Sequence, residues 1–279
     1  MHRLKHGTTK VMNSELIERH FARMGSRFKM TRPTTRQNRP DSYSIDIHQD
    51  NRGEFFDLSV PEKMDGQVDL TVMQIVPEDR HLLLLVRKND EEQKDRFLCG
   101  HDERAWFVAA VPGKVSSVRD AKESLKPWLV RSRQTTEAVP ASQVNLRKNR
   151  AFRRQGEWFF VEAPRLQIDP KLILRNEPIR RGGGKPHTIA EVYRVGGERV
   201  YVHPRFPNGV LTREYIKIMG RTAGMRPSEW RVMARNPEVY ARGTVRHADH
   251  KTITLHGWHR VLMNTESQSE TMRSVAFLD

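Results

Sequence analysis

The stretch Val239-Tyr-Ala-Arg-Gly-Thr-Val-Arg-His-Ala-Asp-His-Lys-Thr-Ile-Thr-Leu255 carries two strand-like segments on either side of a polar turn. Residues 239–246 and 252–255 are rich in β-branched and aromatic side chains, which favour extended backbone. The sequence His-Ala-Asp-His-Lys between them supplies turn chemistry. An antiparallel hairpin is therefore predicted over residues 239–255.

The same kind of pattern recurs along much of the chain. Apolar and polar residues alternate with period two, and Gly, Pro or Asn-containing turns separate the runs. Strands are predicted at residues 43–47, 54–60, 68–76, 81–87, 97–100, 106–111 and 157–161. Apolar residues at three- and four-residue spacing predict helices at residues 15–24, 118–125, 212–219 and 228–235. Gly196-Gly197 favours a hairpin of residues 191–202. The predicted fold class is α+β, mainly antiparallel β with a few short helices, in two β-rich units.

Shifts in composition predict the domain boundaries. The middle of the chain is acidic, residues 131–150 are polar and basic without clear periodicity, and the C-terminus is rich in Ser, Thr and Glu. We expect a basic N-terminal arm with one helix over 1–40, an acidic β-rich domain ending in a helix over 41–130, a basic linker over 131–155, a basic α+β domain with the His-rich hairpin over 156–265 and a loose tail over 266–279.

The net charge of the chain is +15, and it is unevenly distributed. Residues 1–40 carry a net charge of +8, residues 41–110 carry −8, and residues 111–279 carry +15. A sequence pI near 10.3 is typical of proteins that bind phosphate backbones. The acidic segment 41–110 is expected to meet a basic part of the chain or a basic protein partner.

Cysteine content and hydropathy indicate the compartment. The one cysteine, Cys99, excludes an internal disulfide framework and fits a reducing environment. No apolar run reaches the length of a membrane span, and the basic start of the chain is not followed by an apolar stretch. A cytoplasmic protein without a membrane partner is expected.

Four of the twelve histidines lie within residues 247–259, arranged as two His-x-x-His pairs. Clustered imidazoles and carboxylates are typical ligands of zinc or another divalent metal such as manganese. In a tight turn, His247, Asp249 and His250 can converge, whereas His256 and His259 point to opposite faces of a strand. His101 and Asp102 are the candidates to complete the site from a distant segment. The alternative is a cationic turn whose imidazoles contact phosphate.

Basic residues gather in two other places. The segment before Trp158 and the glycine-rich run Arg180-Arg-Gly-Gly-Gly-Lys185 combine cations with an aromatic ring or flexible backbone. Arginine and lysine neutralise phosphates, and aromatic faces stack on unpaired bases. The predicted nucleic-acid contacts are Arg147, Lys148, Arg150, Arg153, Arg154, Trp158, Arg180, Arg181 and Lys185.

These patterns favour a protein that binds nucleic acid, RNA or single-stranded DNA, through basic loops on a β-rich scaffold. One alternative is an enzyme, a metal-dependent phosphodiesterase or nuclease, in which His247, Asp249 and His250 hold the ion and His259 or His256 donates a proton. A second alternative is a non-catalytic assembly subunit that binds an acidic protein. The chain contains no Walker sequence, dinucleotide fingerprint or Cys-x-x-Cys pair that would favour another class.

Overall fold

The computed structural model describes residues 6–32, 42–88, 94–181, 184–221 and 225–268. The chain divides into two compact units at the bond between Lys126 and Pro127. We call the part up to Lys126 the first unit and the part from Pro127 to Ser267 the second unit. The α+β prediction is confirmed: four helices accompany the strands of the described residues, and every strand pair is antiparallel except β1 with β3.

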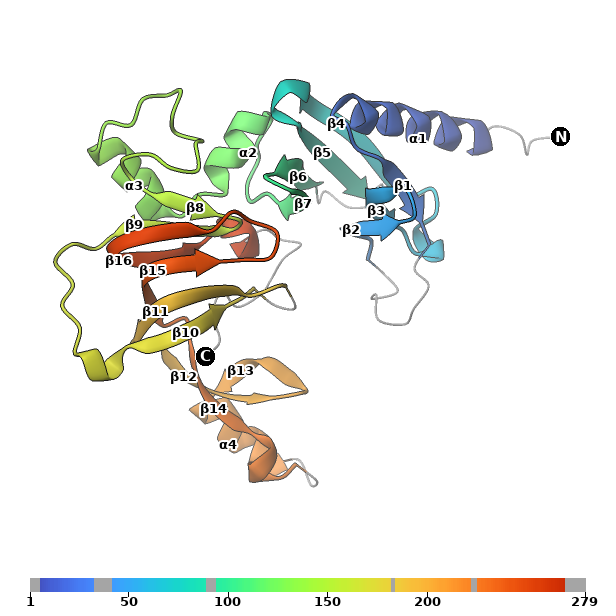
Figure 1. The fold of residues 1–279 in the computed structure, drawn as a ribbon. Helices are drawn as coiled ribbons and strands as arrows, with labels where there is room; N and C mark the ends of the chain where they lie inside the picture. The colour runs from blue at the N-terminus through green and yellow to red at the C-terminus, as the bar shows by residue number, and fades with distance from the viewer. Residues whose placement is uncertain (1–5, 33–41, 89–93, 182–183, 222–224, 269–279) are drawn as a thin grey trace. The chain divides into compact units, whose positions relative to one another are not determined.

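The first unit contains two sheets and two helices (Figure 1). The three-stranded sheet has the order β1-β3-β2, and the four-stranded sheet is a meander of β4, β5, β6 and β7. The elements are α1 (His6–Arg23), β1 (Phe28–Thr31), β2 (Ser44–Asp50), β3 (Gly53–Ser59), β4 (Val68–Val76), β5 (His81–Lys88), β6 (Lys94–Asp102), β7 (Ala105–Ala110) and α2 (Val118–Ser124).

Strand β5 is apolar on both faces because both faces are covered. Leu82 and Leu84 pack in one cluster with Phe21 of α1. Leu83 points to the other face, where it joins Ala121 of α2 in a second cluster. The first helix is therefore part of the core of this unit, whereas the sequence analysis predicted that it would lie in a basic N-terminal arm.

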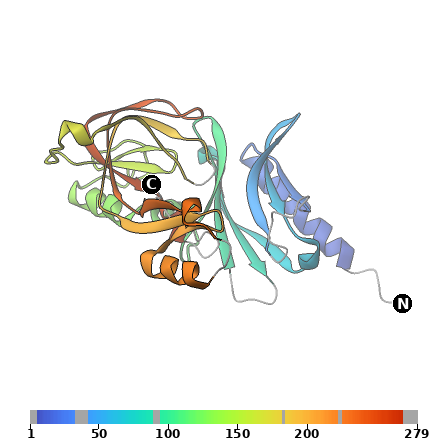
Figure 2. The same cartoon turned by 90° about the horizontal axis from the view of Figure 1, so that it is seen from below.

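The second unit is built on a six-stranded antiparallel sheet with the order β10-β11-β15-β16-β9-β8. Its strands are strongly curved (Figure 2), and β8 and β10 are the edge strands. The elements of this sheet, and the helix that precedes it, are α3 (Trp128–Thr136), β8 (Arg153–Gln155), β9 (Trp158–Glu162), β10 (Leu174–Ile179), β11 (His187–Val195), β15 (Glu238–Arg246) and β16 (Ile253–Met263).

Strand β9 contributes side chains to the hydrophobic clusters on both faces of this sheet. Trp158 and Phe160 belong to the cluster that fills one side of the sheet. Phe159 lies on the opposite side, where it packs with Phe152 and with Val130 of α3. The predicted linker 131–155 is thus wrong: α3, the pair Ala151-Phe152 and strand β8 all belong to this unit.

A smaller sheet is inserted between β11 and β15 and projects from their ends (Figure 1). It has the order β13-β12-β14. Its elements are β12 (Glu198–His203), β13 (Phe206–Leu211), α4 (Thr212–Arg221) and β14 (Arg231–Arg235). Tyr201 of β12 stacks on Tyr215 of α4 at a centroid distance of 4.0 Å.

Two sequence predictions are corrected by this insert. The hairpin predicted over 191–202 does not form, because β11 pairs with β10 and β15 whereas β12 pairs with β13 and β14. Gly196 and Gly197 do adopt positive φ, but they lead the chain from one sheet to another. Residues 228–235 form the strand β14 after a short 3₁₀ turn instead of a helix.

The first residues of the predicted tail belong to the fold. Thr265–Gln268 forms a 3₁₀ turn, in which Glu266 is buried and ion-paired with Arg181. Residues 269–279 lie outside the described residues. So do 1–5 and 33–40 of the predicted arm and 182–183 of the glycine-rich run.

Candidate metal centre

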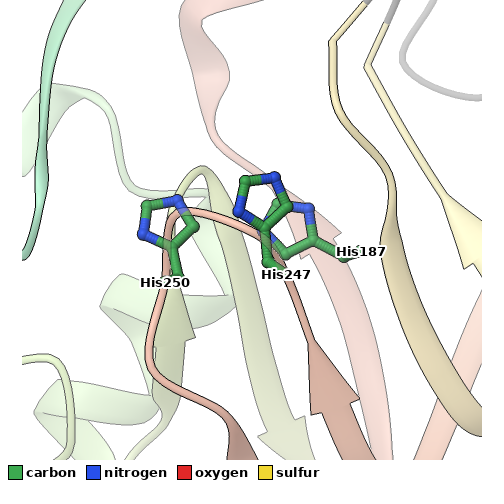
Figure 3. A group of neighbouring side chains, drawn as sticks. All are labelled: His187, His247 and His250. Carbon is green, nitrogen blue, oxygen red and sulfur yellow. The ribbon is translucent and has the colours of Figure 1, made fainter.

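Three histidines of the second unit lie side by side (Figure 3). His187 is the first residue of β11, and His247 and His250 lie in the turn between β15 and β16. One ring nitrogen from each lies within 4.8 Å of the others. We call these three residues the histidine trio. The predicted hairpin therefore supplies two of its members, and a neighbouring strand supplies the third.

The three rings are nearly parallel. The ring centroids of His187 and His247 are 4.1 Å apart, those of His247 and His250 are 4.6 Å apart, and those of His187 and His250 are 5.7 Å apart. Trp158 packs edge-on against His187 from the core side, at 6.3 Å. The trio is thus held between the sheet interior and the turn.

His187 is 1% exposed, and neither of its ring nitrogens has a hydrogen-bond partner among the described residues. A buried polar atom without a partner costs about 1–3 kcal/mol, so native structures rarely keep one without a reason. Burial, and then the neighbouring His247 and His250, lower the pKa of His187 to about 3. The ring is therefore neutral at neutral pH, which is the state that a metal ion requires.

Gly156, in the turn between β8 and β9, faces the same nitrogens. A Cβ atom at this position would lie 2.8 Å from Nε2 of His250 and 3.3 Å from Nε2 of His187. Its φ of +57° is also one that glycine adopts easily. Only a glycine lets the turn come this close to the two Nε2 atoms, so the backbone closes one side of the trio.

The trio needs a small adjustment to hold an ion. In a tetrahedral site with metal–nitrogen bonds of about 2.0 Å, the ligand nitrogens lie roughly 3.3 Å apart. His247 also accepts a hydrogen bond at Nδ1 from the backbone N–H of Asp249, at 3.1 Å. The Nδ1 lone pair of His247 is occupied by this hydrogen bond. His247 can therefore bind an ion through Nδ1 only if the hydrogen bond breaks, or through Nε2 only if the ring proton moves to Nδ1.

Asp249 lies beside the trio but is engaged by a cation. Both of its carboxylate oxygens accept hydrogen bonds from Nζ of Lys185 at 2.9 Å. The Lys185 ammonium is also the main reason that the pKa of Asp249 is lowered. The predicted ligand Asp249 therefore anchors the turn to the segment before β11, and Lys185 is bound to a carboxylate where a phosphate contact was predicted.

The other predicted site residues lie elsewhere. His101 and Asp102 are on β6 of the first unit, where the His101 ring packs edge-on against Trp106 at 4.9 Å. The trio is completed by His187 of the second unit instead. His256 is exposed, and His259 is buried on β16 with its Nδ1 atom 3.0 Å from the carbonyl oxygen of Gly257. Neither belongs to the trio.

Glu157 is an acid that the sequence did not single out. It follows Gly156 in the turn, and burial raises the pKa of its carboxyl group, while Arg181 and His247 act in the opposite direction. It directly follows Gly156, the residue that faces the Nε2 atoms of His187 and His250. No local pattern marked it, because its neighbours come from segments distant in sequence.

The predicted nucleic-acid contacts divide into two groups. Trp158 is fully buried, so stacking of its ring on a base is excluded by its place in the core, and Arg181 is ion-paired with Glu266. Lys148, Arg150 and Arg180 are exposed, and Arg147, Arg153 and Arg154 are half-buried on and before β8. Nη1 of Arg153 donates to the carbonyl oxygen of Thr254 at 2.8 Å.

The exposed aromatic ring of this region is Trp128, which is 72% exposed at the start of α3. The sequence did not identify it, because Trp128 follows Pro127 in a segment without strand periodicity. Cys99 of the first unit is fully buried, and burial raises the pKa of its thiol.

No protein-family model, curated protein or solved structure matches the chain. None of the described helices combines the length and the apolar character that crossing a membrane requires.

Proposed function

We propose that the second unit binds a divalent transition metal ion through His187, His247 and His250 and acts as a metal-dependent phosphodiesterase. The observation that carries the proposal is His187, a buried imidazole whose two nitrogens lack partners among the described residues and which faces two further imidazoles. A metal ion bound there would satisfy a polar group that the protein otherwise buries at a cost.

The donor set favours zinc. Imidazole nitrogen suits zinc, whereas manganese prefers oxygen ligands, and Asp249 is engaged by Lys185. Three protein ligands leave a fourth tetrahedral position for water, as in catalytic zinc sites. When bound, such an ion lowers the pKa of its water and offsets charge on a phosphate.

The surrounding residues have separate tasks in this proposal. Trp158 and the Lys185–Asp249 pair hold the trio in position. Glu157 holds or accepts a proton in this proposal, which is supported by burial that favours its neutral form and by the nearby Arg181, which favours the charged one. The strongly basic surface supports a phosphodiester substrate.

Zinc binding is tested by titrating the chelator-treated full chain with zinc in a calorimeter. Elemental analysis then measures the number of ions per chain. We expect one ion per chain and a Kd at least about tenfold higher for His250→Ala, because a ligand is lost. Gly156→Ala places a methyl group against Nε2 of His250 and is expected to weaken binding similarly. Gly196→Ala is the matched control: it has a similar positive φ of +70°, but its Cβ meets nothing within 4 Å.

Hydrolysis of bis(4-nitrophenyl) phosphate by the zinc-loaded protein tests the enzymatic part. Turnover that is lost with a chelator and in His250→Ala is the expected result. A protein that binds no stoichiometric zinc contradicts the metal centre. A protein that binds zinc but does not accelerate hydrolysis above free zinc contradicts the phosphodiesterase.

Binding of nucleic acid without catalysis is the second candidate, and the exposed Lys148 and Arg150 favour it. Under this alternative the trio is a cationic or structural turn beside a phosphate. The two candidates separate on the same preparation: a binding protein retains labelled RNA and leaves it intact in the presence of zinc, whereas a phosphodiesterase shortens it.

A further inference from the structure

We infer that the second unit carries a binding surface for single-stranded nucleic acid, formed by the basic segment 147–154 and the exposed ring of Trp128. As a binding surface it stands by itself. As the substrate site of the metal centre it rests on the proposed function. The surface is defined as the exposed residues Trp128, Arg131, Lys148 and Arg150, together with Arg153 and Arg154, the half-buried arginines of β8.

The charge of this part of the chain is one-sided. Residues 128–155 contain seven Lys or Arg and a single acid, Glu137, which is ion-paired with Arg133. Lys148 and Arg150 are exposed, and neither forms an ion pair with another described residue. Exposed cations without nearby carboxylates are free to neutralise phosphates and to release counterions.

Helix α3 and the basic segment are joined by a common core. Val130 of α3 packs in one cluster with Ala151 and Phe152, the two residues that follow Arg150. Trp128 is two residues from Val130, and Arg131 lies three residues further along the helix than Trp128, on the same side. The ring of Trp128 and the three exposed cations of the surface are therefore each within three residues, along the chain, of a member of this cluster.

An exposed tryptophan suits unpaired bases. Burying the ring of Trp128 against a base recovers apolar contact that the free protein leaves in water. Stacking is open to every base that is not already paired, whereas duplex bases present only their edges. The combination of one exposed ring with neighbouring cations thus favours a single strand over a duplex.

The same segment leads to the histidine trio. The edge strand β8 ends at Gln155, and the next residue, Gly156, faces Nε2 of His187 and of His250. The amide of Gln155 donates to the carbonyl oxygen of Lys251 at 2.8 Å, which ties this end of β8 to the turn that carries the trio. A single-stranded nucleic acid bound along residues 147–154 would therefore have a phosphate near the trio.

Fluorescence anisotropy with labelled oligonucleotides of about 20 nucleotides tests the surface, in a chelator so that no cleavage occurs. Single-stranded RNA, single-stranded DNA and the corresponding duplex are compared with the full chain. We expect Kd for the single strands to be at least about tenfold higher in Lys148→Glu/Arg150→Glu, with a shallower salt dependence. The matched control is Arg165→Glu/Lys171→Glu, which reverses two exposed cations between β9 and β10 and is expected to have a much smaller effect.

The role of the ring is tested by Trp128→Ala beside Trp128→Phe. Loss of one stacked base is expected to raise Kd about 5- to 100-fold in the alanine variant, and phenylalanine is expected to restore most of the binding. Equal binding by the two charge-reversed variants, or equal affinity for duplex and single strands, overturns the inference. Unchanged circular dichroism and melting temperature establish that the variants are folded.

Failure of this inference can be told from failure of the proposed function. His250→Ala removes a proposed ligand but none of the residues that define the binding surface, so its Kd for the single strands is expected to change far less than that of Lys148→Glu/Arg150→Glu. Loss of binding in Lys148→Glu/Arg150→Glu, together with unaltered zinc affinity, supports the surface whether or not the trio is catalytic.

Discussion

His187 combines two properties that rarely occur together in a stable core. It is buried, and both ring nitrogens lack a hydrogen-bond partner among the described residues. The neighbouring Trp158 contributes only an edge contact. A residue of this kind lowers the stability of the fold unless something binds to it, so the cost itself indicates a ligand.

Replacement of His187 by leucine tests that cost directly. In a chelator, His187→Leu is expected to raise the free energy of unfolding by about 1 kcal/mol, because an unpartnered polar ring gives way to an apolar side chain of similar size. With zinc present the original protein is expected to be the more stable of the two, because at an ion concentration 100 times Kd its free energy of unfolding rises by about 2.7 kcal/mol. Urea unfolding under both conditions measures the difference. A destabilised variant in the chelator would show that the imidazole already has a favourable partner.

At the scale of elements, the strands β2 to β7 of the first unit were predictable because their pattern is local, whereas β1 was missed because it depends on parallel pairing with β3. Strand β5, predicted at residues 81–87, is a continuous apolar run that the structure covers on both faces. The hairpin of β15 and β16 was also predicted, since its turn residues follow one another in the chain.

The remaining features depend on pairing between distant segments. Gly196-Gly197 is typical of a hairpin, but β11 pairs with β10, whose partner residues lie 8 to 18 positions earlier, and with β15, whose partner residues lie 43 to 58 positions later. His187 escaped prediction for the same reason: sixty residues separate it from His247, and only the pairing of β11 with β15 brings them together. Helix α3 was overlooked because its apolar contacts lie in β9 and in residues 151–152.

The insert between β11 and β15 is predicted to be dispensable for the trio. Val195 and Glu238 are directly paired across the two strands, so a two-residue Asn-Gly turn in place of residues 196–237 can close a tight hairpin. We expect this shortened protein to fold and to bind zinc with a Kd within about threefold of the full chain. Circular dichroism and zinc titration measure both properties. A folded protein that no longer binds zinc would place part of the site in the insert.

At the scale of the whole molecule, the chain consists of two units with separate cores. The zinc proposal concerns the second unit alone, and the buried titratable histidine His81 belongs to the first. Different solution conditions should therefore act on different units, and calorimetry can follow two unfolding transitions.

His81 makes the stability of the first unit depend on pH. Burial, and then the nearby Lys122, lower the pKa of His81 to about 4, although Asp79 and Asp102 act in the opposite direction. The unfolded chain, with an ordinary histidine pKa of 6.5, binds more protons than the folded chain between these two values. Stability of the first unit is therefore expected to fall as the pH falls from about 6.5 to about 4, by at most about 1.4 kcal/mol per pH unit.

The substitution His81→Leu isolates this effect, because it keeps an apolar side chain on β5 and removes the titrating ring. In scanning calorimetry at pH 7, 6 and 5, the transition of the first unit is expected to shift less with pH in this variant than in the original chain. Zinc is expected to raise the other transition and to leave this one in place. Equal pH dependence with and without His81 would show that other groups govern the acid sensitivity of the first unit. A zinc-induced shift of both transitions would show that the two units unfold together.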